Sequence, residues 1–349
     1  MLIDRYILKE LVLSFLISVI GLNLLLMMEK VLKLSRVMAG IGASFTDISG
    51  VILLLQPQLL MLTIPMAFLL SILLTFGRLS FDNELIVLRT SGLSFKRISR
   101  PVASLSVILF IASIITSTYL MPWALKRLRT DVNTMLREKA PLSIEPGIFF
   151  TAFRNIVLLI NNKDAPGKFE GVFIYDGRDS SAESVIVARE GEISIGKKGI
   201  GLELKDGTIH NAGKKESTEI HFSSYNFNIL ISSDLIGRKK GEMTPFELYS
   251  AAKKEKGNPA GYYIELDRRF SYPALIFAIA LLAPALSLLA GRTGRTGGFV
   301  VGMSIFALYY IAMVYVENLV KTNRVNHLIC WLPFAVLTTI SLILYRRTD

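Results

Sequence analysis

The segment Gly77–Arg100 reads GRLSFDNELIVLRTSGLSFKRISR and separates two long apolar runs. Those runs, Ile48–Gly77 and Pro101–Leu125, contain no charged residue. Each is long enough to cross about 30 Å of hydrocarbon as a helix, so the segment is interpreted as a loop between two membrane spans. It is basic and amphipathic, and its acidic residue Glu84 is followed by the apolar run Leu85–Leu88. This combination predicts a short helix over 82–93 on which a partner protein docks.

The composition of the whole chain also indicates a membrane protein. Of its 349 residues, 52% are apolar and only 19% are charged, with a mean hydropathy of +0.48, whereas a soluble domain carries about 25% charge. The interval 126–269 holds 23 of the 39 basic and 20 of the 28 acidic residues. This distribution predicts a polytopic membrane protein with one large water-exposed domain. The net charge of +11 fits basic loops, and without a recognition motif we do not expect nucleic acid as a partner.

Six membrane spans are predicted, which makes the chain an α-helical polytopic membrane protein. The first is interpreted as a retained helix continuing to about Met38, because its start is not clearly basic and no convincing signal-peptide cleavage site follows. Pro57 and Pro65 predict that the second span is kinked or divided into two half-helices. The apolar cores of the spans are Leu11–Met28, Ile48–Gly77, Pro101–Leu125, Phe270–Gly291, Thr296–Val316 and Leu328–Tyr345.

An all-β domain is predicted between the third and fourth spans. Short runs rich in β-branched and aromatic residues are separated there by glycine, asparagine, aspartate and serine, which favours an antiparallel sandwich or jelly roll. The runs are Gly147–Phe150, Asn155–Ile160, Phe169–Tyr175, Ser184–Ile195, Leu202–Lys205, Thr218–Phe222 and Tyr225–Ile231. A capping box at Thr244–Glu247, with proline at the first helical position, predicts that helix resumes there. We therefore divide the chain into spans 1–125, a β domain 126–243 and a helical remainder 244–349.

Counting lysine and arginine in the short loops predicts the orientation. With six spans both termini share a side, and that side carries eleven basic residues against five on the other. By the positive-inside rule, both termini and Gly77–Arg100 lie in the cytoplasm and the β domain lies outside, where a bacterial periplasm would suit it.

The sequence contains no recognisable catalytic or metal-binding motif. It has neither a phosphate-binding GxxxxGK[ST] loop nor a GxSxG nucleophile elbow, and its three histidines lack zinc-ligand spacing. Its single cysteine, Cys330, excludes a disulfide within the chain. We therefore expect a non-catalytic protein without cofactor or metal, in which any ATP is handled by a separate partner.

Two groups of charges near the predicted membrane surface are candidate binding residues. Lys30, Lys33 and Arg36 end the first span, and Lys321 and Arg324 end the fifth span on the same outer side. They either reach toward lipid headgroups as ordinary interfacial anchors or bind an anionic headgroup. On the opposite side, Glu84 is either a solvated charge or pairs with a basic groove on a cytoplasmic partner.

Several segments together resemble the LptF/LptG (YjgP/YjgQ) family of lipopolysaccharide export permeases, over essentially the whole chain. The segments are Ile3–Glu10 (IDRYILKE), Glu84–Gly92 (ELIVLRTSG), Leu142–Phe149 (LSIEPGIF), Glu265–Pro273 (ELDRRFSYP) and Trp331–Pro333 (WLP). The resemblance implies a bacterial inner-membrane permease whose inserted domain is a periplasmic β-jellyroll. The Lys30–Lys33 spacing leans toward the LptF branch.

The resemblance also implies partners and residue roles. The chain would pair with a paralogous permease, LptG if this is LptF, and work with two copies of the ATPase LptB, with LptC and with a periplasmic LptA bridge. The 82–93 helix would be the coupling helix seated in a groove of LptB. Glu84 would be its ATPase-contacting acid, with Leu85, Leu88, Arg89 and Gly92 beside it. Lys30 and Lys33, and less clearly Arg36, would face the glycolipid phosphates.

Two alternatives remain open from the sequence. One is an envelope assembly scaffold that transports nothing. The other is an exporter of a different amphiphile, such as a lipoprotein or phospholipid.

Overall fold

The structure is a computed structural model that describes residues 2–40, 43–143, 145–150, 155–165, 167–178, 182–196, 199–213, 217–230, 239–255, 257–290, 294–322 and 325–348. The chain forms two compact units. The first, here called the helical unit, comprises Met1–Met27, Leu55–Leu125 and Lys239–Asp349. The second, the sheet unit, comprises Met28–Leu54 and Lys126–Arg238.

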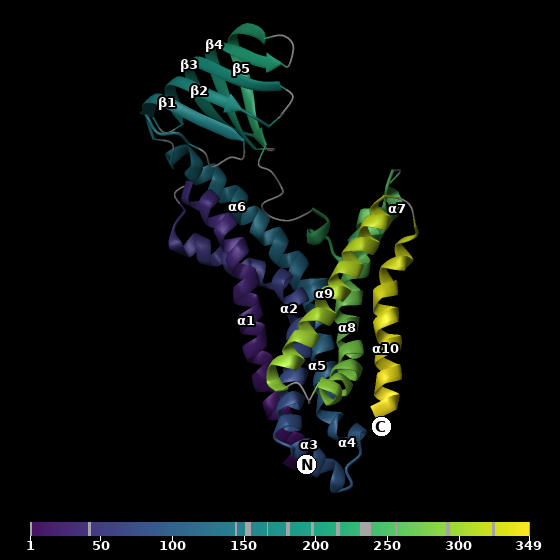
Figure 1. The fold of residues 1–349 in the computed structure, drawn as a ribbon. Coiled ribbons are helices and arrows are strands. Elements are labelled where there is room, and N and C mark those ends of the chain that lie inside the picture. The colour runs from purple at the N-terminus through teal and green to yellow at the C-terminus, as the bar shows by residue number, and fades with distance from the viewer. Residues whose placement is uncertain are drawn as a thin grey trace. The chain divides into compact units, whose positions relative to one another are not determined.

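Within the described residues, six helical segments are long and apolar enough to cross a membrane, as the sequence predicts. Several helices extend beyond the predicted apolar cores, because polar residues at a span's ends continue the same helix. Seven helices form the six segments, because the third contains both α5 and α6. Their bounds are α1 Leu2–Gly40, α2 Phe45–Phe81, α5 Arg100–Ile115, α6 Met121–Ser143, α8 Ala260–Ala290, α9 Gly294–Lys321 and α10 Leu332–Thr348 (Figure 1). Pro57 and Pro65 both lie inside the single helix α2, so the second span is not divided into two half-helices.

The third span is two helices joined by a π-helical turn, η1 Thr116–Leu120. Side-chain hydroxyls satisfy backbone carbonyls around this turn: Thr116 donates to Ala112 and Thr118 to Ile114. Ser117 donates to the carbonyl of Arg269 on α8 at 2.9 Å, so the irregular turn joins the third span to the fourth. The helix α6 then continues to Ser143, so the first part of the interval predicted to be β is helical.

The segment Gly77–Arg100 forms two short helices, α3 Glu84–Thr90 and α4 Phe95–Ile98. The helix α3 ends in a Schellman motif: Gly92 N–H donates to Arg89 O and Leu93 N–H to Leu88 O. Gly92 has a φ of +87°, a conformation that glycine adopts at little cost. The predicted helix over 82–93 is therefore confirmed in type but is shorter at both ends.

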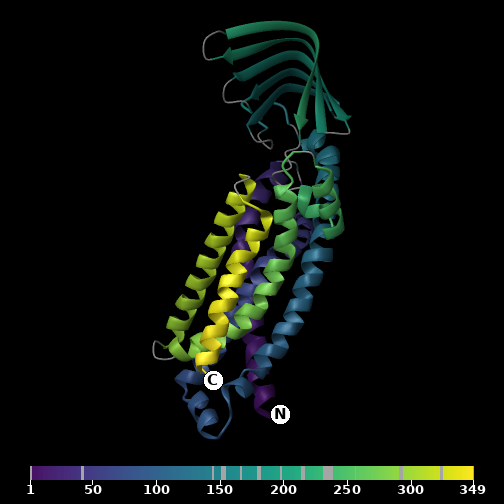
Figure 2. The same cartoon turned by 90° about the vertical axis from the view of Figure 1, so that its right-hand side faces the viewer.

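Within the described residues, the sheet unit contains five antiparallel strands in the sequential order β1-β2-β3-β4-β5. Their bounds are β1 Ile156–Ala165, β2 Lys168–Asp176, β3 Ala182–Gly196, β4 Gly199–Gly213 and β5 Ser217–Leu230. Leu202–Lys205 is part of a longer strand, and Thr218–Phe222 and Tyr225–Leu230 are one continuous strand, so the expected boundaries were wrong there. Gly147–Phe150 is not a strand; Phe150 makes an isolated bridge to Leu158. Figure 2 shows how strongly the sheet is curved.

Helix resumes after the sheet with the turn η3 Lys239–Glu242 and the helix α7 Pro245–Lys254. The predicted capping box is present, since the Thr244 hydroxyl accepts from Glu247 N–H and the Glu247 carboxylate accepts from Thr244 N–H. The last span is preceded by the 3-10 turn η5 His327–Trp331.

A large apolar core cluster lies in the helical unit, and a smaller cluster around Cys330 packs α8, α9 and η5 together. Contacts near both ends of α10 join it to the rest of this unit. Trp331, just before α10, donates to Asp267 on α8, and Tyr345, near the end of α10, lies 5.9 Å from the ring of Phe95 on α4. Trp331 and Tyr345 lie about 21 Å apart along the helix at 1.5 Å per residue, so α10 is attached to its neighbours near both of its ends.

Candidate functional site

The helix α3 presents one face to the core and the other to solvent. Leu85 is only 2% exposed, and Leu88 packs partly buried against the same core. Ile86 and Val87 are 58% and 61% exposed, and Arg89 is also exposed. Leu85 therefore packs α3 onto the core. Ile86 and Val87, which belong to the apolar run Leu85–Leu88 but not to the predicted set of coupling residues, form an exposed apolar surface.

Glu84, at the start of α3, already has partners within the chain. The hydroxyl of Tyr6 on α1 donates to its carboxylate at 3.0 Å. Arg78, near the end of α2, lies 3.5 Å from the other carboxylate oxygen. The Glu84 side chain is still 36% exposed, so the carboxylate can accept a further hydrogen bond from outside.

Arg78 is the centre of this small network. Its guanidinium donates to the Tyr6 hydroxyl at 2.7 Å and forms ion pairs with Glu10 at 3.1 Å and Asp82 at 3.5 Å. One guanidinium thus faces three carboxylates: those of Glu10, Asp82 and Glu84. The carboxylates are therefore held close together by one shared cation, beside the exposed apolar side chains of α3.

The candidate headgroup residues are only partly described. Lys30 is exposed on α1. The side chains of Lys33 and Arg36, and all of Arg324, lie outside the part of the chain that the structure describes. Lys321 ends α9, and its ammonium lies 4.0 Å from the carboxylate of Glu317. Lys321 is 39% exposed, so it can contact water or a headgroup while it neutralises a buried acid.

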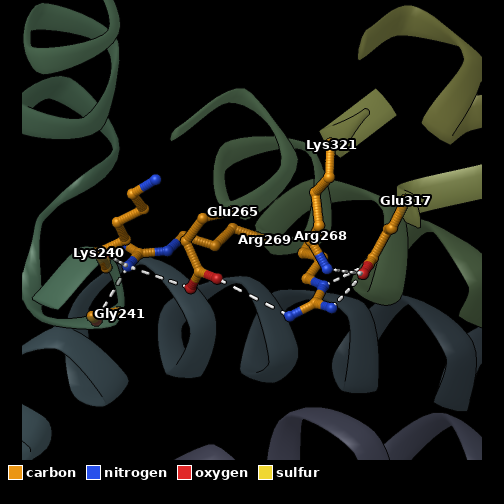
Figure 3. Close-up of polar contacts among 7 residues, drawn as sticks. All are labelled: Lys240, Gly241, Glu265, Arg268, Arg269, Glu317 and Lys321. Carbon is orange, nitrogen blue, oxygen red and sulfur yellow. Dashed lines mark hydrogen bonds and ion pairs between the residues drawn. The ribbon is translucent and has the colours of Figure 1, made fainter. Parts of the chain in front are cut away.

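The helices α8 and α9 are joined by an ion pair that Figure 3 shows in detail. The Nε and Nη2 atoms of Arg268 donate to the two carboxylate oxygens of Glu317, a fork-to-fork arrangement. The Glu317 side chain is only 2% exposed and that of Arg268 is 28% exposed. A buried carboxylate in a membrane helix is stable only when it is paired in this way.

Neighbouring residues of α8 contact other elements, because successive side chains on a helix point about 100° apart. Arg269 is fully buried and donates to the carbonyl of Gly241 in η3 at 3.0 Å (Figure 3). Asp267 accepts from Trp331 Nε1 at 3.2 Å and lies 3.1 Å from the Nδ1 of His327. Residues 267–269 therefore hold η5, α9 and η3, respectively, against one helix.

An apolar groove of about 630 Å³ lies among α8, α9 and α10. Hydrocarbon side chains and aromatic rings line it, including those of Leu286, Ile305, Ala312, Tyr315, Val336 and Ile340. Such a lining suits a hydrocarbon chain.

The family to which these features belong is decided by a match over nearly the whole chain. Residues 5–347 match the family model described as "Lipopolysaccharide export system permease LptF/LptG". The chain belongs to the LptF/LptG family. The sequence resemblance is thus confirmed, and the chain is a multi-pass inner-membrane protein of a permease family, with an inserted β domain.

Two relatives of this LptF/LptG chain show how far the family diverges. An uncharacterised protein of Rickettsia prowazekii is 21% identical and covers 97% of each chain. The lipopolysaccharide export system permease protein LptF of Escherichia coli K12 is 23% identical and covers 93% of this chain and 87% of its own length. The likeness extends over the spans and the β domain together.

Sequence reasoning missed two residues that hold this LptF/LptG chain together. Glu317 falls just after the predicted apolar core Thr296–Val316 and lies inside α9. Its position directly beside that apolar core was the available signal in the sequence, because a carboxylate within a span needs a partner. Tyr6 lies in the quoted segment Ile3–Glu10, but its contact with Glu84 joins positions 78 residues apart. Nothing in local sequence predicts such a pairing.

Proposed function

We propose that the chain is the transmembrane permease subunit of an ABC transporter that extracts lipopolysaccharide from the inner membrane and passes it to a periplasmic bridge. The observation that carries this proposal is the family match over residues 5–347. The exposed surface of α3 carries the Glu84 carboxylate together with Ile86 and Val87. This surface supports the proposal because a cytoplasmic ATPase would dock there.

The chemistry of the helical unit is suited to an amphiphilic substrate. The apolar groove among α8, α9 and α10 fits acyl chains, and Lys321 beside it on α9 carries charge that remains exposed. Lys321 would contact the phosphates of the glycolipid, and Lys30, Lys33, Arg36 and Arg324 are each proposed from the sequence as further phosphate-binding residues. Both termini would be cytoplasmic and the β domain would be a periplasmic jellyroll.

The partners follow from the family. The chain would pair with a paralogous permease, and two LptB subunits would hydrolyse ATP because the sequence has no phosphate-binding loop of its own. LptC and the LptA bridge would receive the lipid. The likeness to the E. coli LptF favours the LptF position, which would make LptG the paralogue.

Co-purification in mild detergent tests the proposal. The purified complex is expected to contain an ATPase and the second permease, and mass spectrometry is expected to find bound lipopolysaccharide. Recovery of the chain without an ATPase would favour the assembly scaffold. A complex enriched in a lipoprotein or phospholipid would instead identify a different amphiphile as the substrate.

Two substitutions test the proposed residue roles. Glu84→Ala should weaken ATPase docking more than folding, and normal assembly with normal ATP hydrolysis would refute the coupling role. Lys30→Asp combined with Lys33→Asp should lower crosslinking of lipopolysaccharide to α1. Undiminished crosslinking would mean that these lysines are interfacial anchors only.

A further inference from the structure

The helices α1, α2 and α3 meet at Glu84, and α1 is distant in the sequence from the other two. Tyr6 and Glu10 lie on the first turns of α1, Arg78 lies near the end of α2, and Glu84 begins α3. Docking at α3 explains why Glu84 is partly exposed, but it does not explain why the same carboxylate is held by α1.

The Tyr6 hydroxyl connects the helices because it donates and accepts at the same time. It accepts a hydrogen bond from Arg78 Nη2 at 2.7 Å and donates to Glu84 at 3.0 Å. The Arg78 guanidinium also lies 5.8 Å from the centre of the Tyr6 ring, within the range of a cation–π contact. The same guanidinium forms an ion pair with Glu10 one turn further along α1. We call Tyr6, Glu10, Arg78 and Glu84 the clamp.

The adjacent face of the same turns of α1 is fixed by burial. Ile7 and Leu11 are essentially inaccessible and belong to the core cluster that also contains Phe76 of α2 and Leu85 of α3. A further ion pair joins Asp4 of α1 to Arg97 of α4 at 2.9 Å. The start of α1 is therefore attached both to α3 and to α4.

We propose that Tyr6 and Arg78 are positioning residues that hold Glu84 and fasten the start of α1 to α3, so that a partner that displaces α3 also moves α1. This inference rests on the proposed function, in which an ATPase acts on α3. Partly exposed ion pairs contribute little to stability, so loss of one clamp contact leaves the apolar core in place. What is lost is the fixed geometry between the two helices.

A distance measurement on the full chain in detergent tests the clamp without any transport assay. Spin labels would be placed at the exposed positions Lys9 and Val87 in a Cys330→Ala background, which removes the only native thiol. The parent should give one narrow distance distribution. Tyr6→Phe and Arg78→Gln should each at least double its width, whereas the hydroxyl deletion Tyr249→Phe, on α7, should leave it narrow. Unchanged widths in both clamp variants would overturn the proposal.

The assembled complex gives the second readout. In the complex with its ATPase, Tyr6→Phe should lower the amount of lipopolysaccharide moved per ATP hydrolysed several-fold, and combining it with Arg78→Gln should add little because the residues act as one unit. A ratio equal to that of the parent would refute the coupling role. If the parent complex moves no lipopolysaccharide at all, the proposed function fails, and the distance measurement still decides the clamp.

Discussion

Removing Arg268 should open the contact between α8 and α9, and the size of the effect can be worked from its burial. In Arg268→Met, the Glu317 carboxylate stays only 2% exposed and keeps Lys321 at 4.0 Å as its counter-ion. Breaking a buried pair in this way costs about 3–5 kcal/mol. The reverse change, Glu317→Gln, leaves a guanidinium that is 28% exposed and can be hydrated, so we expect about 1–3 kcal/mol.

The native thiol reports this opening directly. Cys330 is 1% exposed and packs with Ala260 and Ile264 of α8 and with Val316 and Val320 of α9. If the whole cost appears as local opening, about 1.4 kcal/mol raises the rate of thiol labelling tenfold, and Arg268→Met should accelerate labelling by roughly 100-fold or more. A thiol-reactive dye added to the protein in detergent measures this rate.

Two controls separate the pair from a general charge effect. Arg127→Met removes an exposed arginine that is paired with Asp131 on α6, and it should change labelling little. The double variant Arg268→Met with Glu317→Leu removes both charges and should recover most of the protection, because replacing a buried pair by apolar residues is often neutral. This reasoning would be refuted if Cys330 in Arg268→Met were labelled at the parent rate. It would also be refuted if Cys330 in the double variant were labelled as fast as in Arg268→Met.

Three further changes test other parts of the chain. Gly92→Ala should destabilise the end of α3 by about 1 kcal/mol because of its φ of +87°, seen as faster hydrogen exchange, whereas Gly77→Ala, with open space around its Cβ, should not. The hydrogen bonds from Arg178 hold the pKa of Asp176 below its usual value near 3.8. Because the folded pKa is the lower one, this stabilisation of β2, about 1 kcal/mol, is complete above pH 3.8 and is lost as the pH falls through the folded pKa. Below the folded pKa, the hydrogen-exchange rates of β2 in the parent and in Asp176→Asn should therefore become equal. Ala312→Trp should fill the apolar groove and reduce co-purified lipid, whereas Ile311→Trp, outside the groove lining, should not.

The spans and the helix α3 were predictable because each depends on local sequence. An uncharged run fixes the length of a span, and the turn chemistry of Ser91-Gly92 determines where α3 ends. The capping box at Thr244 was also found because its partners lie three residues apart. The strands were less predictable. Ser223 and Ser224 suggest a break between two strands, but β5 pairs with β4 in one register on both sides of Ser223 and is a single strand.

The contacts that fix the sites could not be predicted in this way. Glu84 meets Tyr6 over 78 positions and Arg268 meets Glu317 over 49, and neither pairing leaves a periodic pattern in the sequence. Composition shows that a carboxylate within a span must have a partner, but only the packing of α8 against α9 shows which residue that partner is.

The clamp and the Arg268–Glu317 pair should fail in different ways, because they differ in burial. The clamp lies at the partly exposed start of α1, where water replaces a lost hydrogen bond at little cost. The Glu317 carboxylate is only 2% exposed, so water replaces a lost partner there much less readily. Tyr6→Phe should therefore reduce transport per ATP while Cys330 remains protected, whereas Arg268→Met should expose Cys330. The contacts to Phe95 and Asp267 come from Tyr345 and Trp331, which are about 21 Å apart along the helix. A clamp variant in which Cys330 is labelled rapidly would therefore show that the two networks are one cooperative unit, and the clamp would then not be a separate positioning device.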